Sequence, residues 1–183
     1  MAERFSQKNL RVRPSSDEDK IVTNAKEHFE RTLVEISGEL VGSVAALEHP
    51  TKNLKLNYEE IFLRDNVPVM IYLITQKRYD IVKKFLSVCL ELQSTNYQTR
   101  GVFPTSFVEE NGKLIGDYGQ RSIGRITSAD ASLWWPILCW YYVNKSGDYA
   151  FGKSQSVQRG IQLLLDLVLH PTFEGTPVLF VPD

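Results

Sequence analysis

Apolar side chains recur at helical spacing between residues 21 and 48. Six of them follow one another at steps of three or four residues, which places them on one face of a helix. The six are Phe29, Leu33, Ile36, Leu40, Val44 and Leu47. Pro50 disfavours continuation past that point, so we predict a helix over residues 21–48. Gly38 and Gly42 would let this helix kink or let a neighbouring element pack closely against it.

Two further helices are predicted in the middle of the chain. Residues 51–66 are expected to form a loop and then an extended or irregular stretch. The helix that follows covers residues 67–77, with Pro68 in its first turn, where proline is tolerated. Another helix is predicted over residues 78–95. Its inward-facing positions are Ile81, Val82, Phe85, Leu86, Val88, Leu90 and Leu92.

Residues 96–127 have a different character, because they are rich in glycine and have no helical period. Within them, Asn111 and Gly112 separate two short strand-like stretches, which is a strong local signal for a β-hairpin. Long non-helical insertions between helices often carry function. We therefore expect functional residues in this segment.

The last third of the chain again predicts helices. One spans residues 129–144, with Trp134 and Trp135 close to its start, and the other spans residues 156–170 and ends before Pro171. The apolar stretch that follows is strand-like and has no element after it. A finished domain rarely ends on such a stretch, so we expect the chain to be the N-terminal part of something larger.

These segments together predict an all-α fold of paired helices with one short β-hairpin insertion. A polar stretch over residues 1–20 precedes the helices and is expected to be a disordered or solvated arm. The folded part then covers residues 21–183, a length that suits one domain.

Composition and charge narrow the function classes. The 183 residues carry a net charge of −1 and no dominant basic patch, so neither nucleic acid nor anionic membrane is an expected partner. No apolar run reaches the roughly 18 residues that span a bilayer, and no apolar signal region opens the chain. Cys89 and Cys139 lie in apolar helical patterns, typical of buried free thiols in a reducing compartment such as the cytoplasm. The histidines share no ligand spacing, so no metal site is predicted.

Asp130 is the first candidate for chemistry, because it precedes two adjacent indoles in an apolar run. One reading makes it a helix N-cap or a first-turn acid favoured by the helix dipole. The other makes it a general acid, with Trp134 one turn later on the same face. An aromatic wall withdraws water from a carboxyl group, and indole faces stack on the C–H surfaces of sugars. A cap position can also be an active-site position, so both readings stay open.

Two further groups of polar residues each have a functional reading and an ordinary structural reading. Arg64 and Asp65 form either a local ion pair, with Asp65 or Asn66 as an N-cap, or a hydrogen-bonding pair for sugar hydroxyls.

The second group lies among glycines in the segment DYGQRSIGR. These residues form either a solvated turn or part of a site, and their spacing alone is weakly specific. The polar members are Asp117, Gln120, Arg121 and Arg125.

Five stretches together resemble the neutral/alkaline invertases of glycoside hydrolase family 100. They read NYEEIFLRDNVP, QTRGVFPTSF, DYGQRSIGRITSADASLWWPIL, SGD and PVLFVPD, and they agree in order and spacing over residues 57–183. Residues 131 and 132 are Ala-Ser, where plant members usually have Ser-Gly, so the chain looks more like the cyanobacterial branch.

The resemblance implies an (α/α)6 barrel that hydrolyses sucrose to glucose and fructose with two carboxyl groups and neither metal nor cofactor. Asp130 matches the family's catalytic Asp, the expected general acid, and sucrose is the expected partner. We predict substrate contacts at Arg64, Asp65, Tyr58, Gln120, Arg125, Trp134, Trp135 and Asp183.

The chain departs from the family in length, because members are more than twice as long. The second carboxyl group, a Glu, is expected in the C-terminal half of the barrel, which we expect to be absent here. The chain would then be an invertase fragment with little or no activity alone. The alternative is a non-catalytic remnant that binds sugar or a partner chain, for which a second copy of itself is one candidate; a plain helical scaffold without a sugar site is the third reading.

Overall fold

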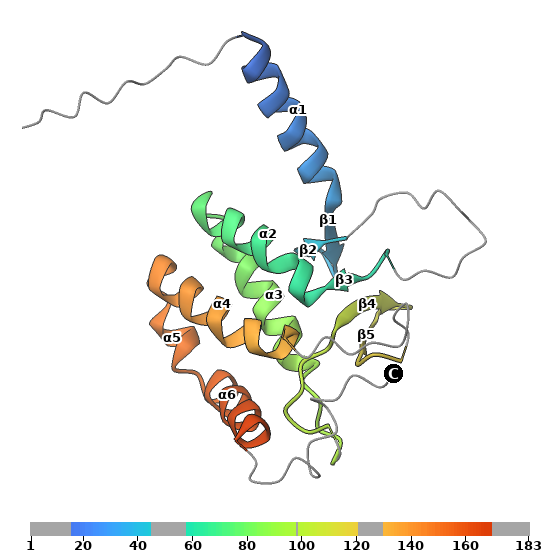
Figure 1. Ribbon diagram of the computed structural model, residues 1–183, viewed down its shortest axis with the longest axis vertical. Helices are drawn as coiled ribbons and strands as arrows, with labels where there is room; N and C mark the ends of the chain where they lie inside the picture. The colour runs from blue at the N-terminus through green and yellow to red at the C-terminus, as the bar shows by residue number, and fades with distance from the viewer. Residues whose placement is uncertain (1–15, 45–57, 98, 121–129, 170–183) are drawn as a thin grey trace, which may run out of the picture. The chain divides into compact units, whose positions relative to one another are not determined.

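The computed structural model describes residues 16–44, 58–97, 99–120 and 130–169 of the chain (Figure 1). The chain divides into two compact units, Met1–Arg31 and Thr32–Asp183.

Helix α1, Ser16–Thr32, is the described part of the first unit. Three acidic residues in its first turn and Arg31 in its last turn suit the helix dipole. Nearly all its side chains are exposed. Residues 16–20, expected to belong to a disordered or solvated arm, are helical, and residues 17–20 are exposed, while residues 1–15 of that arm lie outside the described residues.

The long helix predicted over residues 21–48 is wrong over residues 33–44, and residues 45–48 lie outside the described residues. Strands β1, Leu33–Ile36, and β2, Glu39–Ser43, follow instead and pair antiparallel. Ser37 and Gly38 join them with φ values of 53° and 84°, the left-handed conformation that two-residue hairpin turns require. The apolar residues of this stretch are spaced as in a helix, but the tight turn at Ser37 and Gly38 determines the structure.

Gly42 lies in β2 and confirms one of its two predicted uses, close packing of a neighbour. A β-carbon added there would lie 2.9 Å from Ile61 Cγ2 and 3.0 Å from Asn66 Oδ1. The hairpin can therefore approach the start of the second sheet and the next helix only because this position lacks a side chain.

The second sheet has the strand order β3-β4-β5, with antiparallel neighbours. Its strands are β3, Ile61–Phe62, β4, Ser106–Glu110, and β5, Lys113–Asp117. The predicted hairpin at Asn111 and Gly112 is confirmed, and both residues have positive φ, 54° and 74°. The all-α prediction is thus right only in its coarse form, because two small sheets accompany the helices where one hairpin was expected.

Five helices complete the described part of the second unit. Their bounds are α2 Leu63–Thr75, α3 Tyr79–Glu91, α4 Ala131–Ser146, α5 Tyr149–Gly152 and α6 Gln155–Val168. Three of them, α3, α4 and α6, match the predicted helices within a few residues. Helix α2 begins at Leu63 instead of residue 67, so Pro68 lies inside the helix and not in its first turn.

The core lies where α2, α3 and α4 pack together beside the sheets (Figure 1). Its largest fully buried side chains include Trp135, Phe85, Phe103 and Phe107. Cys89 and Cys139 are both buried and free, as predicted. This arrangement is compatible with part of a larger helical domain. Among the described helices, none is both long and apolar enough to cross a membrane.

Candidate functional site

Asp130 directly precedes helix α4 and occupies its N-cap position. Its backbone is helical, with φ −76° and ψ −22°, and its side chain makes no capping hydrogen bond. Its backbone carbonyl accepts hydrogen bonds from the amides of Leu133 and Trp134, each at 3.0 Å. The capping reading is therefore wrong for the side chain, and the carboxylate is directed elsewhere.

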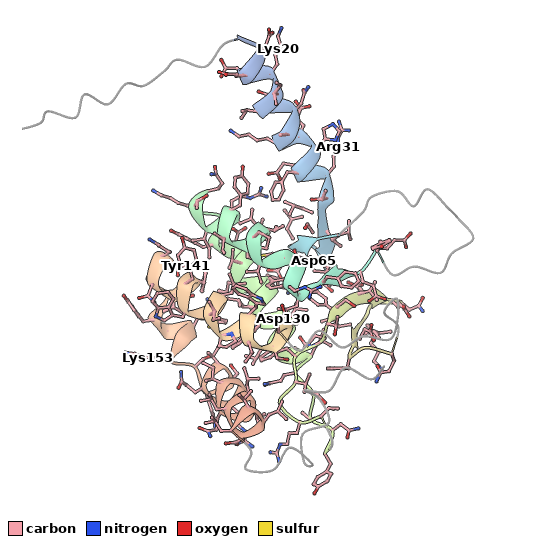
Figure 2. All side chains as sticks on the ribbon, viewed as in Figure 1. Lys20, Arg31, Asp65, Asp130, Tyr141 and Lys153 are labelled. Carbon is pink, nitrogen blue, oxygen red and sulfur yellow. The ribbon has the colours of Figure 1, made fainter. Side chains whose placement is uncertain are left out.

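The carboxylate of Asp130 faces the first turn of α2 (Figure 2). Arg64 Nη1 lies 3.5 Å from Asp130 Oδ1, and Arg64 Nε lies 3.8 Å from Asp65 Oδ1. The three side chains are 58%, 47% and 54% exposed. Exposed ion pairs at these distances contribute roughly 0–1 kcal/mol to stability. The arrangement therefore orients three charged groups toward solvent and adds little to the fold.

The predicted ion pair of Arg64 and Asp65 is confirmed, but the predicted cap of α2 is wrong. Phe62 holds the cap position, without a side-chain hydrogen bond. Asn66 is instead 1% exposed, accepts a hydrogen bond from Ser43 N at 2.7 Å and donates to Ser43 O and Phe62 O, both at 2.9 Å. It thereby ties β2 to the turn that carries Arg64 and Asp65.

The two adjacent indoles of α4 have opposite surroundings. Trp134 is 37% exposed and lies one turn after Asp130 on the same helix face. Trp135 is fully buried: its ring stacks on Phe103 with centroids 4.6 Å apart, and its Nε1 donates to Leu86 O at 3.1 Å. This burial argues against the predicted substrate contact at Trp135, which we assign to the core. Of these two indoles, Trp134 is the one that a ligand can reach.

The glycine-rich segment after β5 is only partly solvated. Asp117 is 1% exposed, and its Oδ1 accepts hydrogen bonds from the amides of Gly119 and Gln120 at 3.0 and 2.8 Å. For Asp117 the solvated-turn reading is wrong, because its carboxylate organises a turn from within. Gln120 is exposed just after that turn, and Tyr58, 38% exposed, lies shortly before β3. The predicted residues Arg121, Arg125 and Asp183 lie outside the described part of the chain.

One cluster therefore unites residues far apart in the sequence: Arg64, Asp65, Asp130 and Trp134, at the starts of α2 and α4. Asp65 and Asp130 each contribute a carboxylate, Arg64 contributes several N–H donors, and Trp134 contributes an indole. All four side chains are exposed to water. Such a set can bind neutral polyhydroxylated molecules and can transfer a proton. Within the described ranges, no group of three His, Cys, Asp or Glu side chains could hold a metal ion.

Comparison with known proteins points to one family. The sequence profile of alkaline and neutral invertases matches residues 25–183. A mitochondrial neutral/alkaline invertase of Oryza sativa is 37% identical, and the match covers 95% of this chain and 30% of the relative. An alkaline/neutral invertase of Arabidopsis thaliana is 34% identical, over 95% of this chain and 33% of the relative. A cytosolic invertase of Oryza sativa is 32% identical, over 89% and 31%.

The chain thus spans about a third of the length of these relatives. The profile covers most of the sequence, including both segments that carry the charged cluster. This chain belongs to the alkaline and neutral invertase family.

Proposed function

We propose that this chain carries the acid side of a site that hydrolyses sucrose to glucose and fructose. The observation that supports it is the half-exposed carboxylate of Asp130, which is not used as a helix cap and stands beside Arg64 and an exposed indole. Family membership gives this cluster its substrate class, because the relatives are named invertases.

In this proposal the protonated Asp130 donates its proton to the glycosidic oxygen as the bond to the anomeric carbon breaks. The face of Trp134 packs against sugar C–H groups, Arg64 donates hydrogen bonds to hydroxyl oxygens, and Asp65 accepts hydrogen bonds from hydroxyl groups. Arg64 Nη1 lies 3.5 Å from Asp130 Oδ1, so its N–H groups are placed to turn from Asp130 to the hydroxyl oxygens of a bound sugar.

Hydrolysis also needs a second carboxyl group that activates water. By resemblance this is a Glu in the part of the family's domain that this chain does not span, and the fold would be the N-terminal part of an (α/α)6 barrel. An inverting site would hold the two carboxyl groups roughly 6.5–9.5 Å apart. Because each acid–base group contributes roughly 10²–10⁴-fold, residues 1–183 alone should have little or no activity. We place the protein in the cytoplasm by analogy with the cytosolic relative.

The test is sucrose turnover by a chain in which residues 1–183 are joined to the rest of the family's domain. Asp130→Asn keeps the size of the side chain and removes its acidity, so glucose release should fall by roughly 100-fold or more. Asp166→Asn is the matched control, since this exposed carboxylate on α6 contacts Gln162 at 2.6 Å and should keep full activity. Full turnover in Asp130→Asn, with the fold intact, would remove Asp130 from the mechanism.

A non-catalytic role is the second candidate, and a specific observation favours it. On α4, Leu133, Ile137 and Trp140 are 45%, 53% and 66% exposed, which is unusual for large apolar residues on one helix and suits contact with a partner chain. Saturable quenching of tryptophan fluorescence by sucrose, with no turnover in the joined chain, would favour this reading over catalysis.

A further inference from the structure

The side chain that follows Asp130 by two positions is buried and hydrogen-bonded. Ser132 is 7% exposed, and its Oγ accepts a hydrogen bond from the backbone amide of Phe103 at 3.0 Å. Residues two apart on a helix point to nearly opposite sides. The first turn of α4 is therefore held from behind, while Asp130 faces Arg64 in front.

A second contact holds the same turn. Trp135 lies three residues after Ser132 on the same buried face, stacks on the Phe103 ring and donates its Nε1–H to Leu86 O. The backbone amide and the ring of Phe103 thus both contact α4, and α3 supplies the remaining hydrogen bond. The start of α4 is therefore held by Phe103 and by helix α3.

The segment that anchors α4 also anchors α2. Two residues after Phe103, the carbonyl of Thr105 accepts a hydrogen bond from the amide of Leu63 at 2.9 Å, and Leu63 is the first residue of α2. Arg64 is the next residue. Residues 103–105 therefore join the start of the helix that carries Arg64 to the start of the helix that follows Asp130.

We propose that Ser132 is a positioning residue, which sets Asp130 against Arg64 by anchoring α4 to residues 103–105. The catalytic meaning of this role rests on the proposed function, but the geometry does not. In Ser132→Ala the amide of Phe103, a residue that is 1% exposed, loses its acceptor inside the core. A buried donor without a partner is unfavourable, so the first turn of α4 will move or open to relieve it.

The experiment uses the 183-residue chain and carbon-13 NMR of the Asp130 carboxyl group, whose signal is assigned by its loss in Asp130→Asn. Arg64→Gln gives the position of this signal without the guanidinium. We expect Ser132→Ala to move the signal at least half of the way to that position, and Ser132→Thr, which keeps the hydroxyl, to return it. Amide exchange of Leu133 and Trp134, both bonded to Asp130 O, should become about tenfold faster relative to the later turns of α4.

Ser154→Ala is the matched control, because Ser154 Oγ also accepts a hydrogen bond from a backbone amide, that of Val157 at 3.4 Å, but it caps the distant helix α6. It should change neither readout. If Ser132→Ala does not fold, Trp135→Phe, which keeps the stacked ring and loses the bond to Leu86, should give the same two changes. An unmoved Asp130 signal, or faster exchange spread equally over α4, would overturn the proposal. Neither readout involves sucrose, so a failure of the proposed function would show only in the turnover assay.

Discussion

Two carboxylates flank helix α4, and their surroundings differ. Asp130, before the helix, faces one described cation at 3.5 Å with its side chain 47% exposed. Asp148, after it, is 23% exposed and accepts hydrogen bonds from Lys83 Nζ at 2.8 Å, Tyr142 OH at 3.0 Å and Phe151 N at 3.0 Å. Asp130 therefore lies at a water-exposed surface, whereas Asp148 belongs to a network of hydrogen bonds.

The surroundings of Asp148 shift the pKa values of Asp148 and Tyr142. The Lys83 ammonium, the amide of Phe151 and the hydroxyl of Tyr142 hold the pKa of Asp148 below its ordinary value. Burial and then the hydrogen bond to Asp148 raise the pKa of Tyr142 to about 12. A carboxylate whose lone pairs are already occupied stabilises the fold and is poorly placed to receive a substrate. Asp130, whose side chain is 47% exposed, lies at a surface that a substrate can reach, in keeping with the role proposed for its carboxyl group.

Removing each carboxylate should give the largest difference. Asp148→Ala loses the cap of α5 and leaves the Tyr142 hydroxyl and Lys83 without their partner, so it should lower the free energy of unfolding by about 2–4 kcal/mol. Asp130→Ala should lower it by no more than about 1 kcal/mol. Urea denaturation of both variants measures this difference, and equal losses would contradict the comparison.

Acid should reduce the contribution of Asp148 to the free energy of unfolding. Because the folded-state pKa of Asp148 is lowered from 3.8, its contribution to stability is present above that pH and is lost as the pH falls through the folded-state value. We expect the wild-type free energy of unfolding to fall more steeply than that of Asp148→Asn below about pH 4. Chemical denaturation at pH 7, 5, 4 and 3 tests this, and parallel curves for the two proteins would refute it.

The smallest expected effect concerns the two cations. Lys83→Met should cost about 0.5–1 kcal/mol, because this ammonium contacts a partly buried carboxylate at 2.8 Å. Arg64→Met should cost at most a few tenths of a kcal/mol, since its contacts are longer and more exposed. Thermal unfolding followed by circular dichroism ranks the two variants; a larger loss for Arg64→Met would reverse their roles.

Helices and strands were predicted correctly where the spacing of apolar residues and the local turn residues indicate the same structure. Helix α3 and the hairpin at Asn111 and Gly112 are examples, because apolar period in one case and turn residues in the other point to a single answer. Between Leu33 and Ser43 the two signals conflict. Apolar residues there satisfy helical steps, yet Ser37 and Gly38 form a tight turn, and the turn determines the structure.

The site shows a similar division. Arg64, Asp65, Asp130 and Trp134 could be named from motifs, because charged and aromatic residues at helix starts are visible in one dimension. The supports of the site could not, since Asn66 and Ser132 act through hydrogen bonds to backbone groups 23 and 29 residues away. A polar residue at a buried position of a helical pattern was the only available signal for either of them.

All three tryptophans of the chain lie in α4, at 37%, 0% and 66% exposure for Trp134, Trp135 and Trp140. A single helix therefore holds two indoles that water-borne quenchers reach and one that they do not. The buried indole emits from a dry environment and reports on the core, while Trp134 reports on the surface beside Asp130. Once Trp140→Phe removes the other exposed indole, the protein carries its own pair of optical probes: Trp135 for the integrity of the fold and Trp134 for whatever binds beside Asp130.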